Sequence, residues 1–123
     1  MVIRMSDKEL NALEDYEVLE LFYSHFPEEV QESKIIKVEN QDCFVTGVVF
    51  GNYTIRNSVI HFDNLILIGD VYADNKSKLS GSLWMTEGDD FTADGASLHD
   101  LELKRLRLKT LYKKAKELGL IKE

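Results

Sequence analysis

The 123-residue chain contains one cysteine, one proline and three histidines, and it lacks a long apolar run. The lone Cys43 excludes an internal disulfide and is compatible with a reducing compartment. The near absence of proline argues against long disordered linkers. No apolar segment is long enough to cross a bilayer, and the N-terminus lacks the apolar core of a signal peptide. These absences predict one cytoplasmic domain, residues 1–123, with no membrane segment.

The sequence also lacks the motifs that carry catalysis or bind metals. His25, His61 and His99 do not have the spacing of metal ligands, and Cys43 has no second thiol. There is no glycine-rich loop that would cradle a phosphate. The acidic loop at residues 87–95 lacks the alternating carboxylates of a calcium site. We therefore expect no metal and no cofactor, and the sequence favours a non-catalytic protein over an enzyme.

What the sequence does contain is a turn-type residue pair every six residues between Phe44 and Met85. The pairs are Gly51-Asn52, Asn57-Ser58, Asp63-Asn64, Gly69-Asp70, Asn75-Lys76 and Gly81-Ser82. The residues between them are mostly β-branched, aromatic or leucine, which is typical of strands. Two arrangements have this punctuation: a hexapeptide solenoid, and an antiparallel meander in which alternate pairs form hairpin turns.

The apolar pattern favours the meander. A hexapeptide solenoid predicts an apolar residue at the start of each hexad, but Arg56, Asp74 and Ser80 occupy three of these six positions. Hairpins at residues 51–52, 63–64 and 75–76 instead make one sheet face mainly apolar. The predicted fold class is α+β, with an N-terminal helix, an antiparallel β-meander of four to five strands, and a C-terminal helix packed on the sheet.

The flanking segments predict helices. Ser6 and Glu9 form a capping box, which starts a helix from Ser6 to about His25 that is either continuous or broken midway. A short helix is expected at 27–33, followed by a leading strand at 34–39. A last helix is expected to begin at an N-cap at Ser97 and to end at Gly119.

Several apolar and acidic side chains predict an interaction surface. The meander register exposes an aromatic and aliphatic sheet face around Trp84, in a polar rim that is typical of protein interfaces. Leu103 and Leu106 fall outside the apolar stripe of the last helix, so they are expected to contact a second protein or a second copy. The predicted interface residues are Trp84, Phe62, Leu65, Leu67, Leu103, Leu106, Glu14 and Glu17. The alternative is that a helical arm of the chain covers this face.

These features predict a non-catalytic protein-binding module that acts through the apolar sheet face or the acidic N-terminal helix. Such a module would be a small inhibitor, adaptor or chaperone-like protein, of the kind that phages and mobile elements encode. We expect a protein partner and a homodimer, because a domain with a single sheet and surplus apolar surface often pairs with a second copy of itself.

A second hypothesis is a ligand-binding or enzymatic cup. In the meander register, Thr46, Asn57 and Asp70 form a polar row across the apolar face, and Tyr53 and Tyr72 lie beside it. A few polar groups in an apolar concavity are typical of small-ligand pockets. The alternative is mechanical, because polar residues and glycines midway along a strand also let a sheet bend.

A third hypothesis is nucleic-acid binding by the basic C-terminal segment. Residues 101–123 contain eight lysines or arginines and three glutamates, whereas the whole chain has a net charge of −7. The predicted phosphate-binding residues are Lys104, Arg105, Arg107, Lys109 and Lys113. The acidic remainder of the chain would repel the same polyanion, so this hypothesis ranks below the first.

Overall fold

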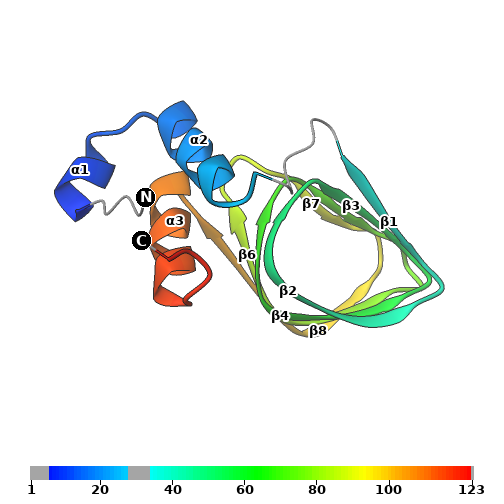
Figure 1. Ribbon diagram of the computed structural model, residues 1–123. Coiled ribbons are helices and arrows are strands. Elements are labelled where there is room, and N and C mark those ends of the chain that lie inside the picture. The colour runs from blue at the N-terminus through cyan, green and yellow to red at the C-terminus, as the bar shows by residue number, and fades with distance from the viewer. Residues whose placement is uncertain (1–5, 28–33, 123) are drawn as a thin grey trace.

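The structure is a computed structural model that describes residues 6–27 and 34–122. The strands wind into an open coil, and the helices lie beside it (Figure 1). The helices are α1 (Asp7–Asn11), α2 (Asp15–His25) and α3 (Leu108–Glu117). The strands are β1 (Ile35–Glu39), β2 (Asp42–Phe50), β3 (Asn52–Arg56), β4 (Val59–Ile68), β5 (Val71–Ala73), β6 (Lys78–Thr86), β7 (Phe91–Ala93) and β8 (Ser97–Leu106).

All the strand pairs are parallel, and they form two four-stranded sheets in the orders β1-β3-β5-β7 and β2-β4-β6-β8. Each turn of the coil adds one strand to each sheet. Its length ranges from 17 residues, where Asn57 bonds to Asn40, to 20 residues, where Asp90 bonds to Asp70. This arrangement is a β-solenoid, so the predicted antiparallel meander is wrong.

None of the six turn-type pairs forms a hairpin: four lie at corners, Asp63-Asn64 forms a bulge in β4, and Gly81-Ser82 lies within β6. Gly51 and Gly69, both at φ +148°, stack at the same corner one coil apart. A Cβ atom on Gly69 would lie 1.9 Å from the carbonyl oxygen of Gly51, so only glycine allows this approach. Asp63-Asn64 adds one residue to β4 relative to its neighbours, and Asn64 has a positive φ of 48°. Residues that favour a turn therefore suit a solenoid corner as well as a hairpin.

The first residue of each hexad, on which the prediction relied, does not keep one place in the solenoid. Phe62 lies in the solenoid interior, whereas Phe50 belongs to the core beneath the helices. Arg56 and Asp74 lie at the corner between the two sheets. The inward-facing apolar position is instead the sixth residue of the hexad, and His61 is its one exception. In the other five hexads this residue is Ile55, Leu67, Ala73, Leu79 or Met85.

Polar side chains at the corners hold consecutive coils in register. At one corner, the Asn57 side-chain amide donates to Asn40 Oδ1 at 2.7 Å, and the Asn57 backbone N–H donates to Asp74 Oδ1 at 3.1 Å. At the opposite corner, the Asp70 N–H donates to Asn52 Oδ1 at 2.9 Å. The Asp90 N–H then donates to Asp70 Oδ1 at 2.8 Å. These ladders satisfy backbone donors that the turns leave without a strand partner.

The described residues form two hydrophobic cores, one on each side of the β2-β4-β6-β8 sheet. Inside the solenoid, fully buried aliphatic side chains such as Leu65 and Leu67 pack against those of the other sheet. On the outer side, Val48, Ile66 and Trp84 pack against side chains of α2 and α3. A strand with both faces covered is apolar on both faces, as parallel strands generally are. This explains the uninterrupted run Leu65–Ile68.

The terminal segments differ from their predictions in one place, residues 97–106. The N-terminal helix is broken into α1 and α2, which is one of the two predicted forms, and the Ser6 hydroxyl accepts from the Glu9 N–H at 3.2 Å as expected. Residues 97–106 form strand β8 instead of the start of the last helix, because Leu101 and Leu103 alternate with polar residues at strand spacing. The positive φ of Gly119, 75°, follows α3 as predicted. The short helix expected at 27–33 lies largely outside the described residues.

In the part of the chain that the structure describes, no helix is long and apolar enough to span a membrane.

Candidate interaction surface

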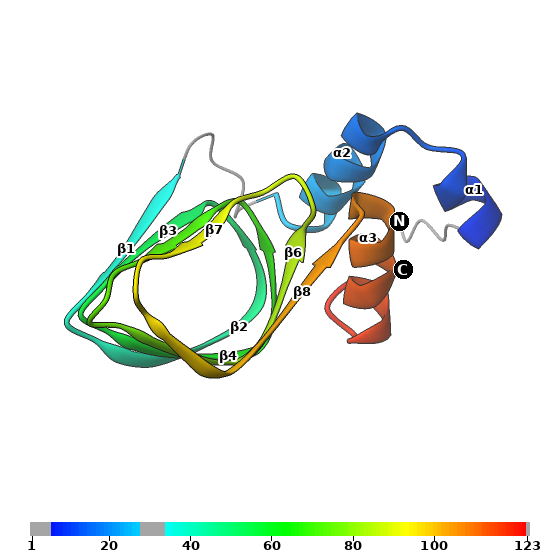
Figure 2. The ribbon, with the colours of Figure 1, turned by 180° about the vertical axis from the view of Figure 1, so that it is seen from behind.

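The helices cover only part of the outer face of the β2-β4-β6-β8 sheet. They cover the half that carries Val48, Ile66 and Trp84, near the carboxyl ends of the strands. The other half carries Phe44, Val59 and His61, which we call the Phe44 patch. Figures 1 and 2 show α2 and α3 together on one side of the solenoid, beside the ends of β6 and β8.

Phe44 is the most exposed large apolar side chain among the described residues, at 79 %. Its ring centroid lies 4.8 Å from that of His61, directly across from it on β4. His61 Nδ1 lies 3.1 Å from the Ser80 hydroxyl on β6, which continues the same row. Val59, 40 % exposed, lies diagonal to Phe44. The sheet therefore presents an aromatic and aliphatic group that its own chain does not cover.

Polar side chains surround the patch on the neighbouring strand positions. Asp42 and Lys78 lie on either side of Val59. Thr46 follows Phe44 on β2, and its hydroxyl donates to the Asp63 carbonyl oxygen at 2.9 Å. An apolar centre within a polar rim is the anatomy of a protein-binding surface.

The surface has little catalytic chemistry. The His61–Ser80 pair lies on an open sheet face, and within the described residues no carboxylate hydrogen-bonds to His61. The nearby Cys43 faces the solenoid interior, where burial first, and then the charge of Asp42, raises the pKa of its thiol. A thiol held in its protonated form is a poor nucleophile. The described residues also contain no cluster of three or more groups that could hold a metal ion.

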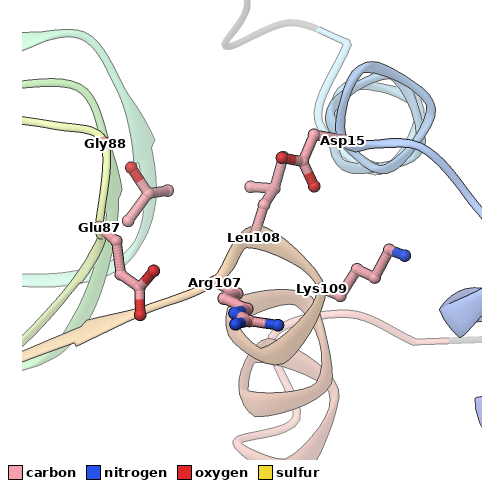
Figure 3. Close-up of a pocket in the computed structure, with 7 residues that line it drawn as sticks. Asp15, Glu87, Gly88, Arg107, Leu108 and Lys109 are labelled. Carbon is pink, nitrogen blue, oxygen red and sulfur yellow. The ribbon is translucent and has the colours of Figure 1, made fainter.

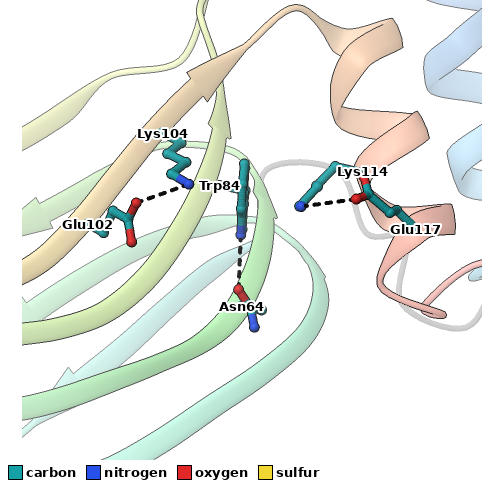
Figure 4. A network of polar contacts seen from close by, with 6 residues as sticks. All are labelled: Asn64, Trp84, Glu102, Lys104, Lys114 and Glu117. Atoms are coloured by element: carbon teal, nitrogen blue, oxygen red, sulfur yellow. Dashed lines mark hydrogen bonds and ion pairs between the residues drawn. The ribbon is translucent and has the colours of Figure 1, made fainter.

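The predicted Trp84 surface is buried. Trp84 is 8 % exposed, and its indole lies between the ammonium groups of Lys104 and Lys114, 4.5 and 4.6 Å from the ring (Figure 4). Its Nε1–H donates to Asn64 Oδ1 at 3.3 Å. The helical arm that the sequence left as an alternative, here α3, covers this side chain.

The other predicted interface residues lie in several parts of the fold. Phe62, Leu65 and Leu67 are fully buried inside the solenoid, so their predicted exposed placement is wrong. Leu103 and Leu106 are half-buried on β8, on opposite faces of the strand.

Glu14 and Glu17 have a local structural role. The Glu14 N–H donates to Glu17 Oε1 at 3.0 Å, where α2 begins. A carboxylate at this position satisfies a backbone donor that the helix itself leaves free.

The structure separates the residues of the predicted ligand cup. Asn57 and Asp70 are exposed at opposite corners of the solenoid, and Thr46 lies on the outer face of β2. Tyr53 is buried in the interior, where burial raises its pKa to about 12. Tyr72 lies beneath the guanidinium of Arg56, 5.9 Å from the ring centroid. The predicted polar row required antiparallel strand pairing, and the observed parallel pairing places these residues apart.

The five predicted phosphate-binding residues do not share one helix. Lys104 and Arg105 lie on β8, and the Arg105 guanidinium donates to the carbonyl oxygen of Asp89. On α3, Lys109 Nζ donates to the Asn11 carbonyl oxygen at 2.8 Å, and Lys113 Nζ lies 3.4 Å from Asn11 Oδ1. These contacts tie the basic segment to the rest of the fold.

Arg107 and Lys109 line an open cleft of about 500 Å³ between the β6–β7 loop and the start of α3 (Figure 3). Carboxylates of Asp15 and Glu87 line the same cleft. A lining of both charge signs is unlike the continuous positive track that follows a nucleic-acid backbone.

The residue that sequence reasoning missed is Phe44. The meander register placed it on the buried apolar face, although it is separated by one residue from the carboxylate of Asp42 and from Thr46. This alternation of polar and apolar residues at the start of β2 was an available signal of an exposed strand face.

Searches of protein-family models, curated proteins and solved structures found no match to this chain.

Proposed function

We propose that this chain is a non-catalytic protein-binding module of the cytoplasm, which binds one protein partner through the Phe44 patch. The exposure of the Phe44 ring, 79 %, carries the proposal. Aromatic side chains often supply much of the binding free energy at protein interfaces when a partner buries them. The solenoid supports this role because it holds the ring on a rigid sheet, which lowers the entropic cost of binding.

The partner is expected to provide an apolar pocket with polar groups around it. Phe44 and Val59 would enter the pocket, while Asp42 and Lys78 would face the rim. His61 stacks against Phe44 and so limits the orientations of the ring. By sequestering such a partner, the module would act as an inhibitor or adaptor.

Capture experiments with matched variants test this function. The full chain is immobilised and exposed to an extract of the cells that contain it, and the captured protein is identified and titrated. Phe44→Ala is expected to weaken its binding at least about tenfold, as loss of an interface hot spot does. Tyr16→Ala is the control, because Tyr16 on α2 is also an exposed aromatic residue, at 66 %. A partner that binds the wild type and Phe44→Ala equally would contradict the proposal.

A further inference from the structure

The last strand of the β2-β4-β6-β8 sheet has a free edge. We call this sheet the larger sheet because its strands are longer than those of the other sheet. Strand β8 ends the order β2-β4-β6-β8, so within the described residues β6 is its only neighbour. The backbone N–H and C=O groups along the other edge are therefore available to a further strand. The helices lie beside the solenoid and do not cross this end (Figure 2).

The apolar interior is incompletely covered at this end. Leu101 and Leu103 of β8 face inward and are only half-buried. One coil further in, Leu79 and Leu83 are fully buried. Because each coil of a solenoid is covered by its neighbours, the terminal coil leaves apolar surface that requires a cap.

The outward-facing charged residues of β8 indicate which strand would complement its free edge. Glu102 and Lys104 lie on the same outer face, with Lys104 Nζ 3.0 Å from Glu102 Oε1 (Figure 4). In an antiparallel pair, directly opposed residues share a face. If two copies of β8 pair about a two-fold axis at Leu103, each Glu102 faces Lys104 of the other copy. Shifting the axis to Glu102 would instead oppose two identical carboxylates, which is unfavourable.

We propose that a second copy of this chain pairs with the first through antiparallel β8 strands centred on Leu103. The two larger sheets become one eight-stranded sheet, and the two Leu103 side chains meet over the ends of the two interiors. Arg105 also faces inward. Its guanidinium donates to the Asp89 carbonyl oxygen, so it does not occupy the position where the two Leu103 side chains meet.

The opposite end of the sheet offers no such complementarity. The exposed outward residues of its edge strand β2 are Asp42, Phe44 and Thr46, which include no cation. Pairing β8 with β2 of another copy would leave Glu102 without a cationic partner from that strand. It would also generate an open filament, whereas the β8 pair closes as a dimer.

Disulfide cross-linking tests the register. In a Cys43→Ser background, Leu103→Cys is expected to form a covalent dimer under mild oxidation, because the paired Cα atoms are about 4.5–5.5 Å apart. Leu101→Cys is the control. Four residues separate its two copies along the strands, about 13 Å, which is too far for a disulfide. Equal cross-linking of both variants would overturn the register, and far-UV circular dichroism checks that each variant folds.

A charge exchange tests the same interface without any change in the interior. Analytical ultracentrifugation of the full wild-type chain is expected to show a dimer, and Glu102→Lys to raise its dissociation constant about tenfold. Adding Lys104→Glu should restore the wild-type value to within about threefold. The control Glu39→Lys, an exposed residue on β1, makes the same charge change at the other end and should leave the dimer unchanged. A monomeric wild type at about 100 μM, or no recovery in the double variant, would overturn the proposal.

Discussion

At the scale of single residues, Trp84 and Phe44 show how position along one sheet face decides the role of an aromatic side chain. Both point outward from the larger sheet. Trp84 lies under α3 between two lysine ammonium groups, whose charges are paired with Glu102 and Glu117. Phe44 lies beyond the helices and contacts His61. One ring therefore contributes to folding and the other is free to contribute to binding.

Truncating these two rings is expected to change the free energy of unfolding by very different amounts. Trp84→Ala should lower the free energy of unfolding by about 3–5 kcal/mol, because it removes a buried ring and leaves a cavity beneath α3. Phe44→Ala should change it by less than about 0.5 kcal/mol, as is usual for an exposed side chain. Urea denaturation followed by circular dichroism measures both values. A Trp84→Ala variant as stable as the wild type would show that α3 does not pack on this sheet.

At the scale of elements, the corner ladders replace the hairpins that the turn residues suggested. Asp74 organises the hydrogen bonds at one corner. Its carboxylate accepts from the Ser77 hydroxyl at 2.8 Å, from the Asn57 N–H at 3.1 Å and from the Lys76 N–H at 3.2 Å. The hydrogen bond from Ser77, followed by that from the Asn57 backbone, lowers the pKa of Asp74 below its usual 3.8. The corner is thus most stable when Asp74 is ionised.

This shift predicts the pH dependence of an Asp74→Asn variant. Because the folded-state pKa is lowered, the stabilisation is fully present above about pH 3.8 and is lost as the pH falls through the lowered value. The melting temperature of the wild type should exceed that of Asp74→Asn at pH 7, and the difference should shrink below pH 3.8. Thermal denaturation across this pH range measures the effect.

Asp63→Asn serves as the control for this titration. Asp63 lies exposed in the β4 bulge, and its carboxylate makes no hydrogen bond or ion pair with the described residues. Its substitution should leave the melting temperature at pH 7 nearly unchanged. A difference between the wild type and Asp74→Asn that stays constant down to pH 2 would contradict the role of the ionised carboxylate.

At the scale of the whole molecule, the two hydrophobic cores differ in the number of chain segments that build them. The solenoid interior is built from four coils, each of which covers the next. The outer core depends on two longer helices and on α1, a five-residue helix with one buried side chain, Leu10. Local opening is therefore expected to begin at the N-terminus and not in the central strands.

Hydrogen exchange should reveal this hierarchy. Backbone amides of β4 and β6, which have a strand on each side, should exchange most slowly, and those of α1 should exchange fastest. Mass spectrometry of peptides at several exchange times measures the order. Leu10→Ala should increase exchange in α1 without changing it in β4. Protection of α1 as strong as that of β4 would contradict the expected order.

The local features of this chain could be predicted from its residues. The Ser6 cap, the leading strand near Ile35 and the glycine that ends α3 follow from short-range chemistry, and all are present. Five of the six turn-type pairs coincide with a corner or the bulge, although the prediction assigned three of the pairs to hairpins. The strand at 97–106 was missed because Leu101 and Leu103, whose alternation indicates a strand, are followed by a helical stripe that was extended backwards over them.

The sequence by itself determined where the chain turns and which segments are extended, because turn and strand preferences act over a few residues. Only the tertiary structure decided that each strand pairs with one about 18 residues later. Glycine and asparagine with positive φ suit a hairpin and a solenoid corner equally well, so these residues do not specify the partner strand. That choice depends on the two-sided burial of β4 and β6 beneath α2 and α3. The same choice buried Trp84 and left Phe44 exposed, and thereby placed the candidate surface.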